Sequence, residues 1–237
     1  MRSRIFPTKS LLRLLPLAAL LLSACNLNNI QTQGSASDND VQWQSRQQAL
    51  NKISQYETRG AFAYIEGTYK TYARFYWQDK DTDRYRLLLT NPLGTTELDL
   101  NVMPGVIEVT DNGGKKYYSD NPTEMIYQLT GMVIPLKNLR AWLIGLPGDA
   151  TDFELDANHL LKSVTWPTPE GDWVVTYQSY DTAITPNLPQ RLELKQGERT
   201  IKLKMDNWDI QNDTKLALSC QIKSFSLHYR ETPRWLP

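Results

Sequence analysis

The sequence predicts a mainly β domain in which one curved antiparallel sheet carries short helices over its apolar face. Segments of alternating apolar and polar residues recur from Thr58 to about Trp208, and this alternation is typical of strands with one buried side. Two segments with helical spacing interrupt the series at 121–131 and 135–148. An apolar sheet face is the natural place for such helices. We therefore expect the sheet to curve into an open or nearly closed barrel, with the helices lying across its mouth.

The composition limits the partners of the chain. Its 237 residues suffice for one large domain or two small ones, and 41% of them are hydrophobic, so a real core can be buried. Twenty-six basic residues balance 26 acidic residues. We expect no nucleic acid partner, because such binding needs an excess of basic surface. We also expect no attachment to anionic lipid by charge alone.

The first 24 residues have the parts of a secretory signal peptide. Arg2, Arg4, Lys9 and Arg13 form a basic segment, and the apolar run LLPLAALLL follows. This run is too short for an ordinary membrane span, which needs about 20 residues. The stretch Leu22-Ser23-Ala24-Cys25 then resembles a bacterial lipobox, in which the cysteine becomes the lipid-modified first residue of the mature protein.

Cys25 is therefore the predicted lipid anchor, although an ordinary cleavage site with a chance cysteine would explain the same residues. Asn26 favours export to the outer membrane, because an aspartate at that position usually signals inner-membrane retention in enteric bacteria. Residues 25–40 are rich in Asn, Gln, Ser and Asp and are predicted to form a flexible tether. An acylated Cys25 leaves Cys220 without an intrachain partner, so we expect no disulfide framework.

A helix is predicted over 41–56, where the folded domain begins. Trp43, Leu50 and Ile53 recur there at spacings that place them on one side of a helix. Asp40 is the predicted N-cap.

Strand-like segments follow from Thr58. The last two before the next helix form a predicted hairpin around Asp111-Asn112-Gly113-Gly114, which is a strong turn signal. The residues expected on the buried face of the earlier strands are Ala73, Phe75, Trp77, Tyr85, Leu87, Leu89, Leu98, Leu100 and Val102.

Two short helices are predicted next. The first has Asn121 as N-cap and Pro122 at the first helical position, and it closes on Gly131. The second is expected to end at Gly145, Pro147 and Gly148. Its apolar side consists of Leu136, Leu139, Leu143 and Leu146, flanked by Trp142.

Strands return after these helices. The final one, RTIKLKMDNW, alternates Ile201, Leu203 and Met205 with Lys202, Lys204 and Asp206. We expect the apolar set to face the core and the polar set to face water.

Catalysis has little support in the sequence. It contains no G-x-S-x-G motif, no paired-histidine metal motif and no phosphate loop. His159 and His228 are the only histidines, and we interpret His159 as a solvated residue at the start of a strand rather than a base. We expect no enzyme activity, no cofactor and no metal site.

The stretch LLLTNPLGTTELDL at 87–100 reads as strand, turn, strand. Pro92 fixes φ and Gly94 tolerates a positive φ, so a tight loop is expected. Leu93 at its tip has two interpretations. It folds back onto the sheet, which would need no further explanation, or it projects to make a functional contact.

Several stretches of the chain together resemble one protein family. TRGAFAYI, YARFYWQ, DRYRLLLTNPLGTTELDL, LTGMVIPLKNLRAWLIGLPGDATD and IKLKMDNW are similar to the LolB family of outer-membrane lipoprotein receptors. The likeness includes the leader and lipobox and then runs nearly continuously from about Trp43 to Trp208.

The resemblance implies an unclosed antiparallel β-barrel over residues 41–208, with a helical lid over a hydrophobic cavity. It also implies a monomer on the periplasmic face of the bacterial outer membrane, anchored through Cys25. Such a protein accepts lipoproteins from the soluble periplasmic carrier LolA, holds their acyl chains in the cavity and inserts them into the outer-membrane bilayer.

The resemblance also assigns roles to residues. Leu93 matches the leucine that family members use for membrane delivery, which makes Pro92, Leu93 and Gly94 the predicted delivery loop. The predicted acyl-cavity and lid residues are Phe75, Trp77, Leu87, Leu89, Leu98, Leu100, Leu139, Trp142, Leu143 and Leu146. An apolar stripe of this kind is also what an ordinary packed core shows.

Two other classes of protein stay open. A tethered lipocalin-like binder of a small apolar ligand would share the cavity but would not depend on Leu93, and an envelope hydrolase would need an unrecognised site. The chain also departs from the family after Trp208. Residues 209–237 could add an edge strand, form a poorly ordered tail or result from a shifted reading frame, and no role is predicted for Cys220.

Overall fold

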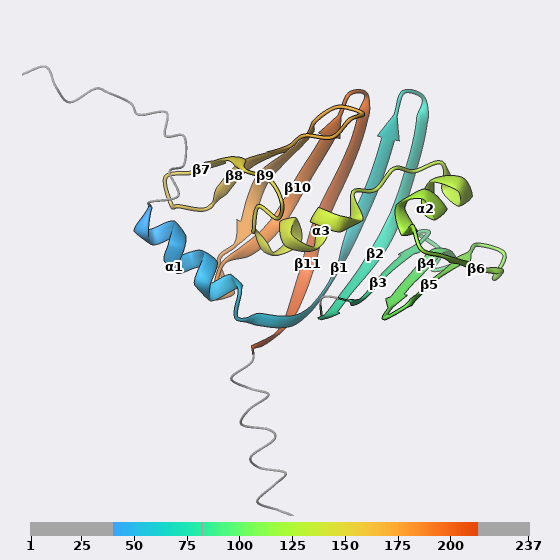
Figure 1. The fold of residues 1–237 in the computed structure, drawn as a ribbon, viewed down its shortest axis with the longest axis horizontal. Helices are drawn as coiled ribbons and strands as arrows, with labels where there is room; N and C mark the ends of the chain where they lie inside the picture. Colours follow the sequence, from blue (N-terminus) through green and yellow to red (C-terminus); the bar gives the residue numbers. More distant parts are fainter. Residues whose placement is uncertain (1–39, 82, 213–237) are drawn as a thin grey trace, which may run out of the picture. The chain divides into compact units, whose positions relative to one another are not determined.

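The computed structural model describes residues 40–81 and 83–212, which form one antiparallel sheet of 11 strands and three short helices (Figure 1). The predicted signal peptide, Cys25 and its tether up to residue 39, and residues 213–237 with Cys220 and His228 lie outside the described residues. Within the described ranges, no helix is both long and apolar enough to cross a bilayer.

The sheet is a meander with one long-range pairing at its centre. The strands are β1 (Ile53–Glu66), β2 (Tyr69–Asp81), β3 (Arg84–Thr90), β4 (Thr96–Met103), β5 (Val106–Asp111), β6 (Lys116–Ser119), β7 (Asp152–Leu155), β8 (Leu161–Trp166), β9 (Trp173–Asp181), β10 (Leu188–Gln196) and β11 (Arg199–Asn212). Their order is β6-β5-β4-β3-β2-β1-β11-β10-β9-β8-β7. Strands β6 and β7 lie at its two ends, so the sheet does not close, and the predicted unclosed antiparallel barrel is confirmed.

The first and last strands pair along nearly their whole length, from Ile53 opposite Asn212 to Glu66 opposite Arg199. The sheet therefore continues four residues beyond the domain limit expected at residue 208.

Helix α1 (Val41–Leu50) begins as predicted but ends early. The Asp40 carboxylate accepts hydrogen bonds from the backbone N–H groups of Gln42 and Trp43 at 2.9 and 3.0 Å, which confirms the N-cap. The expected extension of this helix to residue 56 is wrong, because Ile53 already belongs to β1. The spacing of apolar residues fits both structures here, and pairing with β11 gives the backbone of this segment its hydrogen bonds.

Helices α2 (Pro122–Thr130) and α3 (Leu136–Ile144) lie where the sequence predicts helices. The Asn121 side chain accepts from the N–H of Glu124 at 3.2 Å and caps α2, and Gly131 ends it at φ 73°. Gly145 ends α3 in the same left-handed conformation. Leu146 therefore lies beyond the helix and not on its apolar side as expected.

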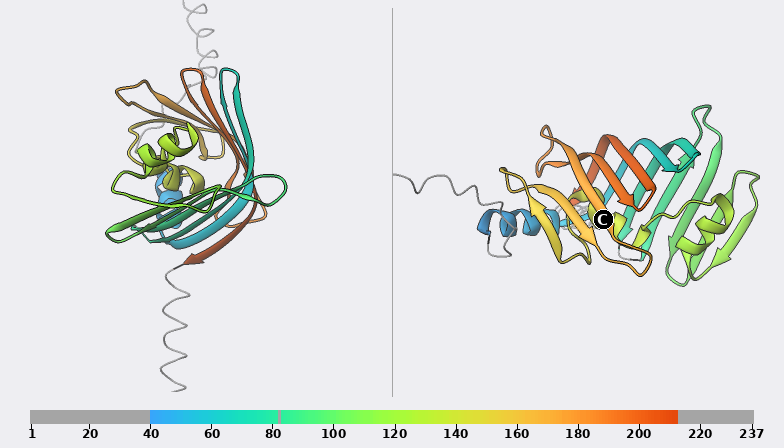
Figure 2. Two further views of the ribbon diagram at one scale, coloured as in Figure 1. Left: turned by 90° about the vertical axis from the view of Figure 1, so that its right-hand side faces the viewer. Right: turned by 90° about the horizontal axis from the view of Figure 1, so that it is seen from above.

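Both helices lie within the curve of the sheet, against its inner face (Figure 2). The residues predicted to alternate inward on β2, β3, β4 and β11 are buried or half-buried there, whereas Lys202, Lys204 and Asp206 face outward. The main hydrophobic core consequently fills the space between the inner face and the helices.

Candidate functional site

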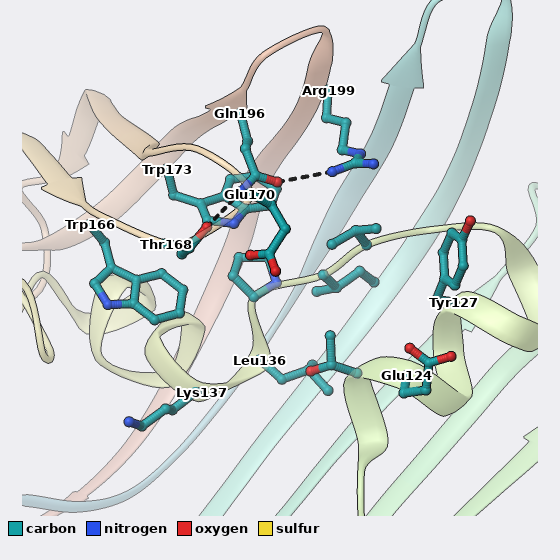
Figure 3. A pocket seen from close by; sticks show the side chains of 14 residues that line it. Glu124, Tyr127, Leu136, Lys137, Trp166, Thr168, Glu170, Trp173, Gln196 and Arg199 are labelled. Carbon is teal, nitrogen blue, oxygen red and sulfur yellow. Dashed lines mark hydrogen bonds between the residues drawn. The ribbon is translucent and has the colours of Figure 1, made fainter.

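A cavity of about 380 Å³ opens between the helices and one end of the sheet (Figure 3). Helices α2 and α3 and the segment 131–135 between them line one side, and we call these three parts the lid. The other side is formed by the turn between β8 and β9 and by the hairpin between β10 and β11. The cavity therefore lies where the lid meets the ends of strands that are far apart in the sequence.

Apolar side chains form most of the inner wall. Ile134 and Leu136 of the lid are buried and face the cavity together with Trp173 of β9. Trp166 of β8 also lines it and packs edge-on against Trp142 of α3, with ring centroids 5.9 Å apart. A wall of this composition suits the hydrocarbon part of a ligand.

A polar network lies beside this wall and fastens the lid to the sheet. The Tyr64 hydroxyl accepts from the backbone N–H of Val133 at 3.4 Å and donates to Glu66 at 2.7 Å, while Arg199 donates to Glu66 at 2.8 Å. The hydrogen bond from Tyr64, helped by Arg199, lowers the pKa of Glu66. Burial, together with Glu66, raises the pKa of Tyr64 to about 12. At neutral pH Glu66 is therefore ionised and Tyr64 is protonated, so the tyrosine hydroxyl can donate to the carboxylate.

The opposite rim is fixed by a buried glutamine. The Gln196 side chain donates to the Gly171 carbonyl at 2.9 Å and to the Thr168 hydroxyl at 3.1 Å, and it accepts from Arg199 at 3.1 Å. These bonds hold the β8–β9 turn against the β10–β11 hairpin. The rim on this side is therefore connected to the sheet through the Gln196 side chain.

The far end of the lid is held by an ion pair whose residues do not line the cavity. Arg140 of α3 contacts both carboxylate oxygens of Asp79 on β2 at 2.6 and 2.8 Å and also donates to the Asp81 carbonyl at 2.6 Å. Burial raises the pKa of Asp79 although Arg140 opposes the shift. Burial alone would lower the pKa of Arg140, but the bonds to Asp79 raise it overall.

Three tyrosines from separate strands add hydrogen bonds to lid carbonyls. Tyr56 donates to the Arg140 carbonyl at 2.7 Å, Tyr177 to that of Trp142 at 3.2 Å and Tyr69 to that of Thr130 at 2.9 Å. The lid is thus attached to the sheet through side chains at several points, and none of these bonds belongs to a continuous backbone ladder.

None of the ten residues predicted to line an acyl cavity lines this one. Nine of them are buried in the core between sheet and lid, and Leu146 is half-buried against it. The ten residues are Phe75, Trp77, Leu87, Leu89, Leu98, Leu100, Leu139, Trp142, Leu143 and Leu146. They pack against one another here, and their role as an acyl-binding surface stays a prediction.

Of the residues that line the cavity, the sequence singled out only Leu136, as part of the apolar side of the second helix and not as a cavity residue. Trp166 and Trp173 lie directly opposite each other where β8 pairs with β9. The stretch WPTPEGDW carries a signal for this arrangement, since two tryptophans flank a Pro- and Gly-containing turn. The lid segment 131–135 carried no comparable signal.

The predicted delivery loop has a well-defined geometry. The Asn91 side chain accepts from the backbone N–H groups of Leu93 and Thr95 at 3.0 Å each, and Gly94 has φ 87°. Leu93 is 92% exposed. The interpretation in which Leu93 folds back onto the sheet is therefore wrong, and the leucine projects into solvent.

His159 lies apart from the cavity. Its Nδ1 atom is 2.6 Å from a carboxylate oxygen of Asp40, the N-cap of α1. It occupies the tight turn before β8, with φ 57°. In the described ranges, no group of three or more His, Cys, Asp or Glu side chains is placed to hold a metal ion.

Comparisons with known proteins agree on one family. The family model described as "Outer membrane lipoprotein LolB" matches residues 54–208. The chain is 58% identical over 200 residues to outer-membrane lipoprotein LolB of Photorhabdus laumondii, which covers 84% of this chain and 95% of that protein. The LolB protein of Serratia proteamaculans is 55% identical over 202 residues, covering 85% and 97%.

Solved structures are more distant. A LolA superfamily protein from Nitrosomonas europaea superposes with a TM-score of 0.47 at 10% sequence identity, covering 70% of this chain and 93% of that one. A similarity of this size supports no conclusion about function.

Proposed function

The chain belongs to the LolB family of outer-membrane lipoproteins, and from this premise we propose that it receives lipoproteins from the periplasmic carrier LolA and inserts them into the outer membrane. The family acts in lipoprotein localisation and is not a family of enzymes. In this proposal the protein is a monomer on the periplasmic face of the outer membrane, attached through acylated Cys25.

The apolar cavity under the lid is the observation that supports cargo binding. An acyl chain of about 15 methylenes costs about 12 kcal/mol to leave in water, so a receptor must enclose it. The cavity volume of about 380 Å³ lies within the range of about 300–1,000 Å³ that is usual for ligand pockets. Trp166, Trp173 and Leu136 would contact the first part of the chain.

A complete acyl chain needs the lid to move. The core between sheet and lid is filled by residues such as Phe75, Leu89 and Leu143. Lifting the lid would expose their apolar side chains, and an acyl chain could then cover them. Cargo would thereby stabilise an open state that is only sparsely populated without it.

Transfer would proceed down a series of increasing affinities. Each 1.4 kcal/mol by which the cavity binds the cargo more tightly than the carrier does favours handover tenfold. The bilayer must hold the acyl chains more tightly still. This mechanism needs no bond chemistry and no nucleotide.

Leu93 is suited to the last step. Burying one leucine is worth about 1.5–3 kcal/mol, which biases an encounter with the membrane but cannot anchor a protein. Anchoring belongs to Cys25, which lies outside the described residues. The exposed leucine would act as a weak and repeatable membrane contact.

The test uses the full chain with Cys25→Ala, soluble LolA loaded with a lipoprotein, and phospholipid vesicles. We expect Leu93→Glu to leave receipt of cargo from LolA unchanged and to stop its delivery to the vesicles, because a carboxylate cannot enter the apolar layer cheaply. Receipt is measured by co-purification of cargo and delivery by its flotation with the vesicles.

Val41→Glu is the matched control. Val41 is the next most exposed of the large hydrophobic residues that the structure describes and lies on α1, so its replacement should leave both steps intact. Normal delivery by Leu93→Glu would remove the loop from the mechanism and favour a binder of a small apolar ligand.

A further inference from the structure

The outer face of the sheet carries a second groove, of about 450 Å³, beside the delivery loop. Ala61 and Ala63 of β1 lie in it, and Pro92 of the loop lines it. The loop between β3 and β4 projects on the side of the sheet opposite to the helices (Figure 2). We call this feature the outer groove; it is separate from the cavity under the lid.

Strand register brings four cations into the outer groove. Arg191 of β10 lies opposite Lys204 of β11, and Lys204 lies opposite Ala61. Ala61 in turn lies opposite Arg74 of β2. One row of positions across four strands thus carries three cations around one alanine. Lys202 adds a fourth from the next row, opposite Ala63.

These cations exceed the acids that neutralise them. Asp206 pairs with Arg74 at 2.7 Å and Lys204 at 3.0 Å, and Glu193 pairs with Lys202 at 3.1 Å. Glu193 is shared further with Lys195. Among residues 40–81 and 83–212, no acidic residue lines the outer groove itself.

Arg191 adds to the excess of positive charge at the outer groove. It forms no ion pair with any carboxylate in the part of the chain that the structure describes. Like charges directly opposite each other on neighbouring strands destabilise a sheet, yet Arg191 and Lys204 face each other in this way. A chain with no net charge therefore concentrates positive charge beside Leu93.

The remaining side chains at the outer groove suit a membrane interface. Tyr72, opposite Ala63, is 59% exposed and lines the groove. Tyrosine prefers the headgroup level of a bilayer, and the long arms of Lys and Arg can lie along apolar surface while their charges reach phosphate. Apolar Leu93, aromatic Tyr72 and the cations together match the layers of a phospholipid surface.

The geometry points to a specific occupant: the outer groove binds the phosphate groups of membrane phospholipids while Leu93 enters the acyl layer. This inference rests on the proposed delivery role of Leu93 and deepens it. The leucine supplies a contact at depth, and the cations fix the orientation of the sheet on the bilayer.

The test measures binding of the full chain with Cys25→Ala to vesicles that contain phosphatidylethanolamine and an equal share of phosphatidylglycerol. Each cation near an anionic membrane surface contributes about a fivefold change in affinity. We expect Arg191→Gln combined with Lys204→Gln to weaken sedimentation with the vesicles about 25-fold. The salt dependence of binding should become shallower in the same variant.

Lys80→Gln is the matched control. Lys80 is an exposed cation on β2, the strand that carries Arg74. Six residues of strand separate the two positions by about 20 Å. This variant should bind the vesicles as the parent does. Both replaced cations of the double variant are exposed, and an unchanged thermal unfolding curve would establish that it is folded.

Two results would overturn the inference. Unchanged vesicle binding by the double variant would show that the outer groove does not meet phosphate, while the role of Leu93 would stand. Loss of cargo receipt from LolA in vesicle-free solution, with vesicle binding intact, would make the groove a protein-docking surface. A different result would contradict the proposed function itself, namely normal delivery of cargo to the vesicles by Leu93→Glu.

Discussion

Arg140 joins the lid to the sheet through a contact that is largely removed from water. Its partner Asp79 is 4% exposed, and the guanidinium also stacks over the Tyr85 ring at 5.2 Å. We expect Arg140→Met to lower the free energy of unfolding by about 3 kcal/mol, because it leaves a buried carboxylate without its cation. Urea unfolding of the full chain measures this loss.

A second substitution, at Asp79, separates the loss caused by the unpaired charge from the loss caused by altered packing. Arg140→Met combined with Asp79→Leu removes both charges and should recover much of the stability, since an apolar pair of similar volume can replace a buried ion pair. If the variant with both Arg140→Met and Asp79→Leu is as unstable as Arg140→Met alone, the loss of stability comes from packing around Tyr85 and not from the unpaired carboxylate.

The geometry of the loop around Leu93 could be predicted from the sequence only in part. The turn itself was predictable, because Pro92 and Gly94 restrict the backbone in known ways. Whether the leucine folds back or projects depends on the two Asn91 side-chain hydrogen bonds that set the loop, and in the structure the side chain is 92% exposed. Sequence periodicity does not contain that information.

At the scale of one element, β1 depends on a glycine where it meets β11. A Cβ atom at Gly60 would lie 1.7 Å from the Lys204 carbonyl oxygen and 3.0 Å from the Phe75 ring. The register of the two strands also shifts between Arg59 and Gly60. We expect Gly60→Ala to destabilise the protein by at least about 1–3 kcal/mol, the usual cost of overpacking, because backbone must move.

A second glycine supplies the control for that prediction. At Gly113, in the β5–β6 turn, an added Cβ would meet only the Asp111 side chain, at 3.3 Å. Gly113→Ala should therefore change the urea midpoint far less than Gly60→Ala. Equal effects of the two substitutions would show that β1 and β11 can separate slightly without cost.

The limits of α2 were predicted correctly, whereas the end of α1 and the extent of the apolar side of α3 were not. Asn121 and Gly131 bound α2 as their capping chemistry requires. The end of α1 was missed because Leu50 and Ile53 fit either a helix or an inward-facing strand. Leu146 was placed on α3 by its apolar spacing alone, although Gly145 already ends that helix. Apolar spacing gives the type of an element more reliably than its limits.

Across the whole molecule, buried tyrosines make stability sensitive to alkaline pH. Burial raises the pKa values of Tyr56 and Tyr177 well above the ordinary value of 10.0 and that of Tyr64 to about 12. The unfolded chain releases these protons near pH 10, whereas the folded chain retains them. Their contribution is therefore complete below about pH 10 and declines as the pH rises above it, and the contribution of Tyr64 is lost as the pH rises through about 12.

Urea unfolding at successive pH values, with tyrosinate absorbance followed in parallel, measures this dependence. We expect the free energy of unfolding to fall as the pH rises above 10, with the absorbance change delayed in the folded protein. Tyr177→Phe should show a shallower fall, because it removes one of the shifted groups. Stability that stays constant from neutral pH to about pH 11 would contradict the burial of these hydroxyls.

The sequence by itself determined the alternating strands, two capped helices, the tight loop around Leu93, and membership of the LolB family. These follow from local chemistry, since alternation, caps and turns act over a few residues. The tertiary structure alone decided that β1 pairs with β11, that the lid packs on a filled core, and that the open cavity lies at the Trp166–Trp173 end. It also gathered Arg74, Arg191 and Lys204 beside the loop, because side chains from strands distant in sequence become neighbours only once their register is set.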